Sequence, residues 1–228
     1  MGLKHALEAD HVAAVASLAS KATSLREGLA LGATWGLGHT ITLFVFGSVV
    51  LMVDTMIPEQ LALTLEFFVG CMLVFMGGAV IKEIIKKRIH LHAHRHADGI
   101  IHLHFHSHAQ DKVDHQGSPH QHTHSQQFSM RALMVGMMHG MAGSAALILL
   151  SLNSVSSIGT GLVYILLFGV GSIVGMALLS IMMVVPLRYS EFTANNTYQG
   201  LQVFIGLATL FLGVGIMYET SVTHGLFV

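Results

Sequence analysis

The stretch Leu65-Glu-Phe-Phe-Val-Gly70-x4-Phe75-Met-Gly77 recurs near the C-terminus as Leu201-Gln-Val-Phe-Ile-Gly206-x4-Phe211-Leu-Gly213, at a constant offset of 136 residues. A second pair of segments matches at an offset of 134, with Gly2-Leu-Lys-His5 corresponding to Gly136-Met-Met-His139. Two similar segments in the same order and at nearly the same offset indicate that the chain consists of two related halves.

Both halves are rich in long apolar runs. Hydrophobic residues make up 53% of the 228 residues and charged residues only 10%, whereas a soluble domain carries roughly 25% charged residues. About 20 mostly apolar residues are needed for a helix to cross the hydrocarbon core of a bilayer. Six runs meet that condition, at residues 3–20, 28–53, 61–82, 131–151, 158–185 and 200–219. We therefore predict an all-α membrane protein with six transmembrane helices.

The repeat and the six runs together predict inverted topology. A unit of three spans that is repeated once inserts the second time with opposite orientation, and such inverted repeats are typical of transporters whose substrate is held where the repeats meet. The expected organisation is a first three-helix repeat at 1–82, a histidine-rich loop at 83–129 and a second three-helix repeat at 130–228.

The distribution of basic residues predicts the orientation in the membrane. Most lysines and arginines fall in or beside the odd-numbered loops, whereas Asp54 and Glu59 lie on the other side. The positive-inside rule then places the histidine-rich loop in the cytoplasm and both termini outside, in the inner (plasma) membrane. No cleavable signal sequence is expected.

The first span carries four ionisable side chains, His5, Glu8, Asp10 and His11, within seven positions. Each costs about 3 kcal/mol at the centre of a bilayer, so such residues are expected to be functional. On a regular helix Glu8 and His11 share a stripe with His5, whereas Asp10 points about 140° away. Either a break in the helix brings Asp10 round, or Asp10 orients a ligand from behind. A buried charge relay or proton path is the competing interpretation.

Two further histidines, His39 and His139, lie well inside apolar runs, and His139 is the repeat counterpart of His5. Histidines on three helices favour a shared metal site, so we expect a distorted first span completed by His39 and His139. Imidazole combined with carboxylate suits nickel, cobalt, zinc or iron, and disfavours magnesium and calcium. Glycines at Gly32-x3-Gly36 and Gly136-x3-Gly140 would let helix backbones approach closely around such a site.

The loop holds twelve of the seventeen histidines. Eight alternate with other residues on either side of Asp98-Gly99, which predicts a β-hairpin with metal-binding positions. The eight are His90, His92, His94, His96, His102, His104, His106 and His108. If His96 pairs with His102, all eight share one face; a two-residue turn would shift the pairing by one and split them between faces. A solvated linker is the alternative, and buffering, delivery and gating all remain open as roles.

The segment His5-Ala-Leu-Glu-Ala-Asp10-His11 resembles the signature of the nickel/cobalt transporter family, and Leu37-Gly-His39-Thr40 resembles its second motif. Size, second half and loop are most similar to the compact urease-accessory-type branch of that family. The resemblance implies a permease for Ni²⁺ or Co²⁺ with His5, Asp10, His11 and His39 as functional positions. Where larger members carry an acidic Phe-Asp-Thr motif, this chain has His139-Gly-Met-Ala-Gly, which leaves ion preference and direction open.

The predicted function is a secondary permease for nickel or cobalt, with zinc and iron less favoured. No phosphate-binding loop of an ATPase is present. Uptake is favoured because the membrane potential draws cations inward; efflux is the alternative, and a membrane-anchored metal sensor or storage protein is a second. An intramembrane protease would need His-Glu-x-x-His, which is absent, so no enzyme and no prosthetic group are expected. The predicted partners are the metal ion, the lipid bilayer and cytoplasmic metal chaperones, and the near-zero net charge argues against nucleic acid.

Overall fold

The structure is a computed structural model that describes residues 1–22, 24–53, 58–88, 91–95, 101–105, 130–142, 157–193 and 195–227. It is dominated by helices, with one two-stranded hairpin among the described residues. The helices are α1 (Gly2–His5), α2 (Ala9–Ala19), α3 (Leu25–Val53), α4 (Glu59–Arg88), a helix over 130–142, α6 (Ile158–Thr193), α7 (Asn195–Tyr218) and the π-helical turn η1 (Glu219–Thr223). The strands are β1 (Leu91–Arg95) and β2 (Ile101–Phe105).

Four of the described helical segments are long and apolar enough to cross a membrane: Leu25–Val53, Glu59–Ile85, Ile158–Ser190 and Thr197–Thr223. They correspond to the second, third, fifth and sixth predicted spans, and the chain is a multi-pass membrane protein. The first predicted run is instead divided between α1 and α2. With 11 residues, α2 is about 16 Å long and cannot cross a bilayer core alone. The fourth run is described only over 130–142, since 143–156 lie outside the described residues.

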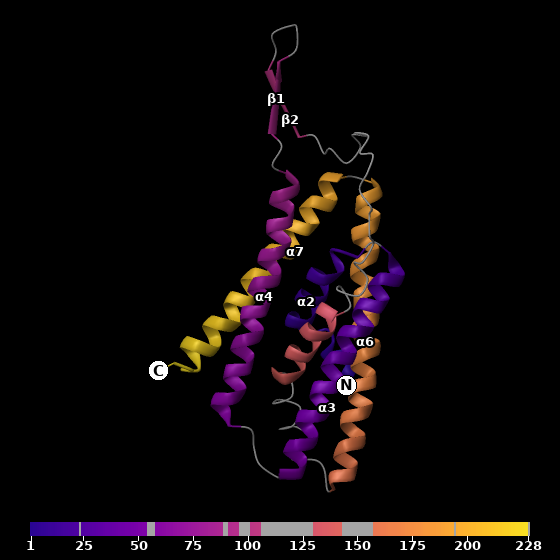
Figure 1. Cartoon of the computed structure of the whole chain (residues 1–228), viewed down its shortest axis with the longest axis vertical. Coiled ribbons are helices and arrows are strands. Elements are labelled where there is room, and N and C mark those ends of the chain that lie inside the picture. The colour runs from indigo at the N-terminus through magenta and orange to yellow at the C-terminus, as the bar shows by residue number, and fades with distance from the viewer. Residues whose placement is uncertain are drawn as a thin grey trace, which may run out of the picture.

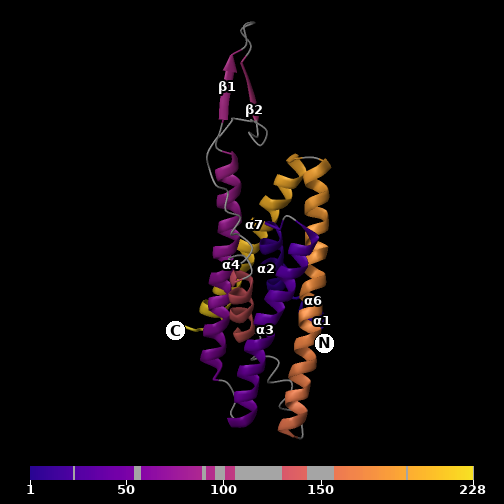
Figure 2. The ribbon, with the colours of Figure 1, turned by 45° about the vertical axis from the view of Figure 1, so that its right-hand side comes forward.

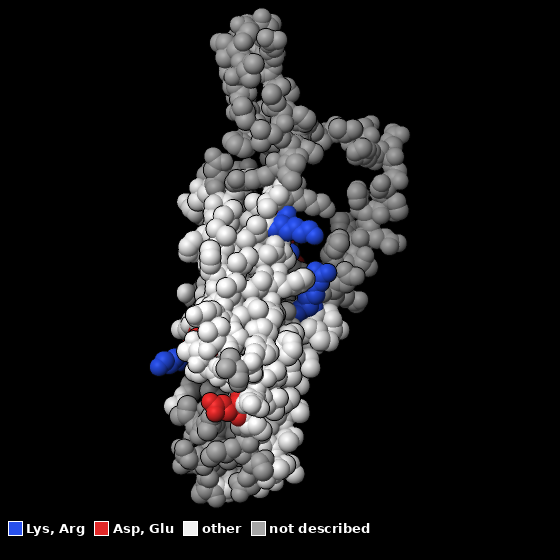
Figure 3. Space-filling view, turned by 90° about the vertical axis from the view of Figure 1, so that its left-hand side faces the viewer, with Lys and Arg blue, Asp and Glu red and all other residues white. Residues whose placement is uncertain are grey.

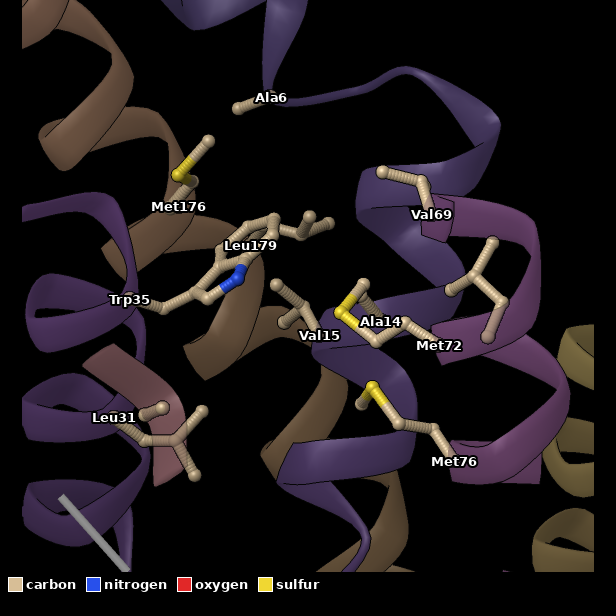
Figure 4. Close-up of a cluster of buried hydrophobic side chains, with 12 residues drawn as sticks. Ala6, Ala14, Val15, Leu31, Trp35, Val69, Met72, Met76, Met176 and Leu179 are labelled. Carbon is tan, nitrogen blue, oxygen red and sulfur yellow. The ribbon is translucent and has the colours of Figure 1, made fainter. Parts of the chain in front are cut away.

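The long helices pair as α3 with α6 and α4 with α7, and α2 lies between the pairs (Figures 1 and 2). A cluster of buried apolar residues from α2, α3, α4 and α6 lies between these helices, and Leu212 and Ile216 of α7 pack against it (Figure 4). Its fully enclosed members include Val15 of α2, Trp35 of α3, Leu73 of α4 and Met176 of α6. The short helix α2 is therefore surrounded by protein, which is where a bilayer tolerates a helix that is interrupted.

Two predicted helix ends were wrong. Helix α4 continues to Arg88, past the predicted end at 82, so the first residues assigned to the loop are helical. Helix α6 continues through Pro186 to Thr193, although the fifth span was expected to stop at 185. Lysine, arginine and glutamate are good helix formers beyond the bilayer core. Proline within a membrane helix is tolerated because neighbouring groups satisfy the backbone carbonyl it leaves free.

Glycines set the close approach of α4 and α7. A Cβ atom at Gly213 would lie 2.7 Å from the carbonyl oxygen of Gly70, and one at Gly77 would lie 2.6 Å from that of Gly206. Real Cβ atoms do not come that close to a backbone oxygen, so these positions require glycine. Membrane helices commonly pack through small residues in this way, because lipid supplies no hydrophobic force to drive helices together.

The outer surface is that of a membrane-embedded bundle. Figure 3 shows a face on which most of the described surface is uncharged. A few basic residues lie on it, and the main acidic patch lies below them. Large apolar side chains such as Phe75, Leu167 and Phe211 are exposed on the surface of the helices. Apolar exposure along whole helices is expected where the surrounding solvent is hydrocarbon.

The hairpin follows α4 and projects beyond the bundle (Figure 1), and its two strands pair in an antiparallel register. His92 pairs with His104 and His94 with His102. Residues of this parity share one face of an antiparallel ladder, so these four positions lie on the same face. We expected His96 to lie opposite His102, whereas the structure pairs His94 with His102, a shift of two residues. A shift of two residues preserves the shared face. His90, His96, His106 and His108 lie outside the described residues.

We predict that Gly213→Leu destabilises the protein by at least about 1–3 kcal/mol, because the new side chain must displace the α4 backbone. Thermal unfolding in detergent, followed by tryptophan fluorescence, measures the effect. Gly215→Leu is the matched control, since nothing lies within 4 Å of a Cβ at Gly215 on the same helix. Equal melting temperatures for the two variants would contradict this packing.

Candidate metal site

The site begins with the break in the first span. Helix α1 ends at His5, and the amide groups of Leu7 and Glu8 donate to the carbonyl oxygens of Lys4 and His5, three residues back. Glu8 then takes an extended conformation with ψ 148° and forms the N-cap of α2. An unbroken helix would separate residues 5 and 11 by about 9 Å along its axis. The break brings the rings of His5 and His11 to 4.4 Å between centroids.

Four buried imidazoles meet at this break. The ring centroid of His11 lies 4.6 Å from that of His139 and 5.4 Å from that of His39. His5 lies 5.2 Å from His39. All four residues are buried, with relative exposures of 8% for His5 and at most 1% for the others. They come from α1, α2, α3 and the helix over 130–142, so the site depends on tertiary packing and on both halves of the chain.

Two carboxylates bind the histidine rings from the side. Asp10 Oδ1 lies 2.8 Å from His11 Nδ1, and Asp10 Oδ2 lies 3.1 Å from Nε2 of His139. Glu8 Oε1 lies 2.9 Å from His5 Nδ1. A neutral imidazole that donates from Nδ1 to a carboxylate presents a lone pair at Nε2, which is the arrangement usual behind metal-bound histidines. Asp10 is partly buried and Glu8 exposed, so the Asp10 contacts are the less screened of the two.

The remaining ring nitrogens are the groups available to an ion. His5 Nε2, His11 Nε2, His139 Nδ1 and both nitrogens of His39 are buried and have no hydrogen-bond partner among the described residues. Leaving such a group without a partner costs about 1–3 kcal/mol. A cation that accepts the lone pairs of several imidazoles at once would remove that cost.

Two sets of three residues have ligand atoms within 4.8 Å of one another: His5, His11 and His39, and Asp10, His11 and His139. Two ligand atoms of a tetrahedral first-row metal lie about 3.4 Å apart, so the side chains of either set would have to move closer together to bind an ion. In the second set, however, the carboxylate already bonds both rings. The first set can use nitrogens that are free, and therefore fits an ion without breaking a hydrogen bond. Glu8 belongs to neither set and instead contacts His5.

Glycines let the backbones approach around these side chains, as expected. A Cβ at Gly140 would lie 2.5 Å from the carbonyl oxygen of His39, and one at Gly136 would clash with that of Trp35. A Cβ at Gly32 or Gly36 would likewise crowd the backbone of α6. The helix over 130–142 can therefore lie directly against α3 beside its histidine.

One relative aligns with the whole length of the chain. The urease accessory protein UreH of Bacillus sp. (strain TB-90) is 34% identical to it over 231 aligned residues, which span 100% of this chain and 91% of that protein.

The chain belongs to the UreH family.

No family model and no solved structure matches it. The assignment agrees with the urease-accessory-type branch, which the size, the second half and the histidine-rich loop of the chain predicted. It also agrees with the prediction that the chain is not an enzyme, because the UreH relative is named as an accessory protein.

Sequence reasoning missed two aromatic residues that hold the histidines. Trp35 lies 5.4 Å from both His11 and His139 between ring centroids, and Phe168 lies 5.2 Å from His5. Trp35 is the one tryptophan in the chain and precedes His39 by four residues, hence on the same face of α3. That spacing was a usable signal. Phe168 carries no comparable mark in the sequence.

We predict that Asp10→Asn lowers the affinity of the purified protein for Ni²⁺ by roughly 10- to 100-fold, because the amide no longer fixes His11 and His139 in their orientation. Isothermal titration calorimetry in detergent measures it. Glu59→Gln removes an exposed carboxylate at the start of α4 and serves as the control. An affinity of Asp10→Asn equal to that of the control would show that Asp10 does not orient the ligands.

Proposed function

We propose that this member of the UreH family is a secondary permease that carries Ni²⁺ or Co²⁺ across the plasma membrane. The observation that carries the proposal is the convergence of four buried histidines inside a bundle of apolar helices. Imidazole nitrogens at bilayer depth suit a first-row transition metal and not magnesium or calcium. The relative's role as a urease accessory protein fits a supply of nickel, the metal of urease.

In this proposal His5, His11 and His39 bind the ion through nitrogens, and Asp10 and Glu8 orient them. His139 shares Asp10 with His11, so it either holds the carboxylate or replaces a ligand as the ion moves. The second set of Asp10, His11 and His139 provides a neighbouring position that has His11 in common with the first. A shared ligand allows an ion to pass between two positions without being released into the apolar interior.

We further propose that the helices form two inverted three-helix repeats. The support is a set of contacts that recur with their partners exchanged. In the pair of α4 and α7, Gly70 meets Gly213 and Gly77 meets Gly206, where Gly206 and Gly213 are the repeat counterparts of Gly70 and Gly77. Reciprocal contacts of this kind are the mark of two-fold symmetry at an interface.

The same exchange occurs around the histidines. A Cβ at Gly2 would meet the carbonyl of Phe168, and one at its counterpart Gly136 would meet that of Trp35. Trp35 and Phe168 in turn correspond to each other, since Trp35-Gly-Leu-Gly and Phe168-Gly-Val-Gly match at an offset of 133. The histidine cluster therefore belongs to the region where the two repeats meet, as in other transporters built from inverted repeats.

The proposed direction is uptake, with the histidine-rich loop in the cytoplasm and both termini outside. A divalent ion that moves inward gains about 4.6 kcal/mol per 100 mV of membrane potential. The positive-inside rule supports the placement of the loop. Efflux coupled to a proton is the second candidate. In that case the carboxylates of Asp10 and Glu8 would have to carry the proton.

The four hairpin positions on one face, His92, His94, His102 and His104, are proposed to receive the ion on the cytoplasmic side. The other loop histidines of the alternating tract extend the same pattern in sequence. Cytoplasmic metal chaperones would then collect the ion from this face. A sensor or storage protein would instead depend on the loop alone, with the helices as an anchor.

We predict that His11→Ala abolishes the flux of radioactive nickel into right-side-out membrane vesicles at an imposed interior-negative potential, because both sets of ligands lose their common member. Glu59→Gln is expected to retain flux. Western blotting of the membrane fraction checks that both variants insert. Unchanged nickel flux in His11→Ala would refute the site, and flux that runs outward would refute uptake.

We predict that deletion of residues 90–124 leaves a measurable part of the nickel flux, because the transport site lies within the bundle. Vesicle assays on the deletion, and on a variant with alanine at His92, His94, His102 and His104, separate the loop's length from its imidazoles. Complete loss of function in both would favour the sensor or storage protein over the permease.

A further inference from the structure

Helix α6 contains a buried hydroxyl that the proposed site does not use. Ser172 is fully buried, and its Oγ has no hydrogen-bond partner among the described residues. Ser180, two turns further along the same helix, is buried equally, but its hydroxyl donates to the carbonyl of Gly28 at 2.7 Å. A buried hydroxyl without a partner is uncommon and costs about 1–3 kcal/mol, so its position calls for an explanation.

The neighbours of Ser172 on α6 fix the direction in which it points. Gly171 and Gly175 pack against α1, where a Cβ would meet Gly2 and Ala6. On the other side Gly169 packs against Thr40 of α3, and Gly36 of α3 packs against Ile173. At 100° per residue, Ser172 lies between these two faces of the helix. Its side chain therefore enters the wedge between α1 and α3.

The two helices that form this wedge carry two of the four clustered histidines. Helix α1 carries His5 and α3 carries His39, and the two rings lie 5.2 Å apart. Phe168, one turn before Ser172 on α6, contacts the ring of His5 at the same centroid separation. The unpaired hydroxyl of Ser172 is thus directed toward the wedge between the helices that carry His5 and His39, and both histidines also have unpaired ring nitrogens.

The repeat gives Ser172 a specific counterpart. Trp35-Gly-Leu-Gly-His39 in α3 matches Phe168-Gly-Val-Gly-Ser172 in α6. In each segment the aromatic ring contacts a histidine of the cluster: Trp35 lies against His11 and His139, and Phe168 against His5. Ser172 therefore occupies in the second repeat the position that His39 occupies in the first.

We propose that Ser172 is a further residue of the metal site, in which its hydroxyl oxygen is a ligand to the ion held by His5, His11 and His39. The inference rests on the proposed function. A hydroxyl binds a transition metal much more weakly than an imidazole does. The serine thus leaves one position of the coordination sphere easily exchanged, as in metal sites that bind a substrate or water at an open position. This makes Ser172 a determinant of how tightly the ion is held and of which ion fits.

The decisive experiment places a soft ligand at residue 172. Ser172→Cys is made in a Cys71→Ser background, so that no other thiol is present, and the purified protein is titrated with Co²⁺ and Ni²⁺. A cysteine thiolate bound to either ion gives a near-ultraviolet charge-transfer absorption band. We expect that band in Ser172→Cys and in neither the Cys71→Ser parent nor the matched control Ser180→Cys. Stoichiometric metal binding by Ser172→Cys without the band would overturn the proposal.

Affinity gives a second test that needs no larger or more reactive side chain. Ser172→Ala is expected to weaken Ni²⁺ binding by about threefold to tenfold, the loss of one polar contact, while Ser180→Ala is expected to bind as the parent does. Equal affinities for the two alanine variants would contradict the role of Ser172. Failure of the parent itself to bind Ni²⁺ or Co²⁺ would instead refute the proposed function, so the two outcomes are distinguishable.

Discussion

The break between α1 and α2 is the feature on which the histidine cluster depends. A four-residue helix such as α1 has no independent stability, because helix formation is cooperative and its first turn is costly. It is held in place by α6, where Gly171 and Gly175 leave room for Gly2 and Ala6. The position of His5 beside His11 is thus fixed by glycines on a helix far away in sequence. A substitution at these glycines would move His5 although neither glycine contacts the histidine cluster.

The charge arrangement around the break follows from the same geometry. Ending α1 at His5 exposes the amide groups that begin α2, and Asp10 lies in the first turn of α2, where a carboxylate is stabilised by the helix dipole. Its Oδ1 accepts from the backbone amide as well as the ring of His11, at 2.8 Å each. Asp10 therefore has hydrogen-bond partners both in its own helix and on the helix over 130–142. In the proposed function, Asp10 neutralises part of the charge of a divalent ion without binding that ion directly.

Much of this was accessible from the sequence. The angle between Asp10 and the stripe of His5 and His11 on a regular helix predicted a distortion of the first span, and the break at Glu8 confirms it. The four apolar spans and the hairpin were also predictable, since both depend on local periodicity. Continuation of α6 through Pro186 was not, because it depends on neighbours that satisfy the backbone. The roles of Trp35 and Phe168 were also missed, since they follow from which helix faces which.

The two halves of the chain differ at one pair of equivalent positions, and this difference bears on how an ion would be released. In the proposed repeat, His5 corresponds in sequence to His139 but His39 corresponds to Ser172, so equivalent positions of the two halves carry different side chains. If residue 172 were also a histidine, the proposed site would have four imidazole ligands. Such a site would bind a transition metal as tightly as a structural zinc site, in which the coordination sphere is closed. A carrier must release its ion on the far side of the membrane, so binding that is too favourable would stop transport. In the proposed site, a hydroxyl in place of one imidazole would weaken the binding of the ion at a single position. In the proposed transporter, the packing of the two repeats would thus enclose the ion, and the hydroxyl of Ser172 would allow the ion to leave.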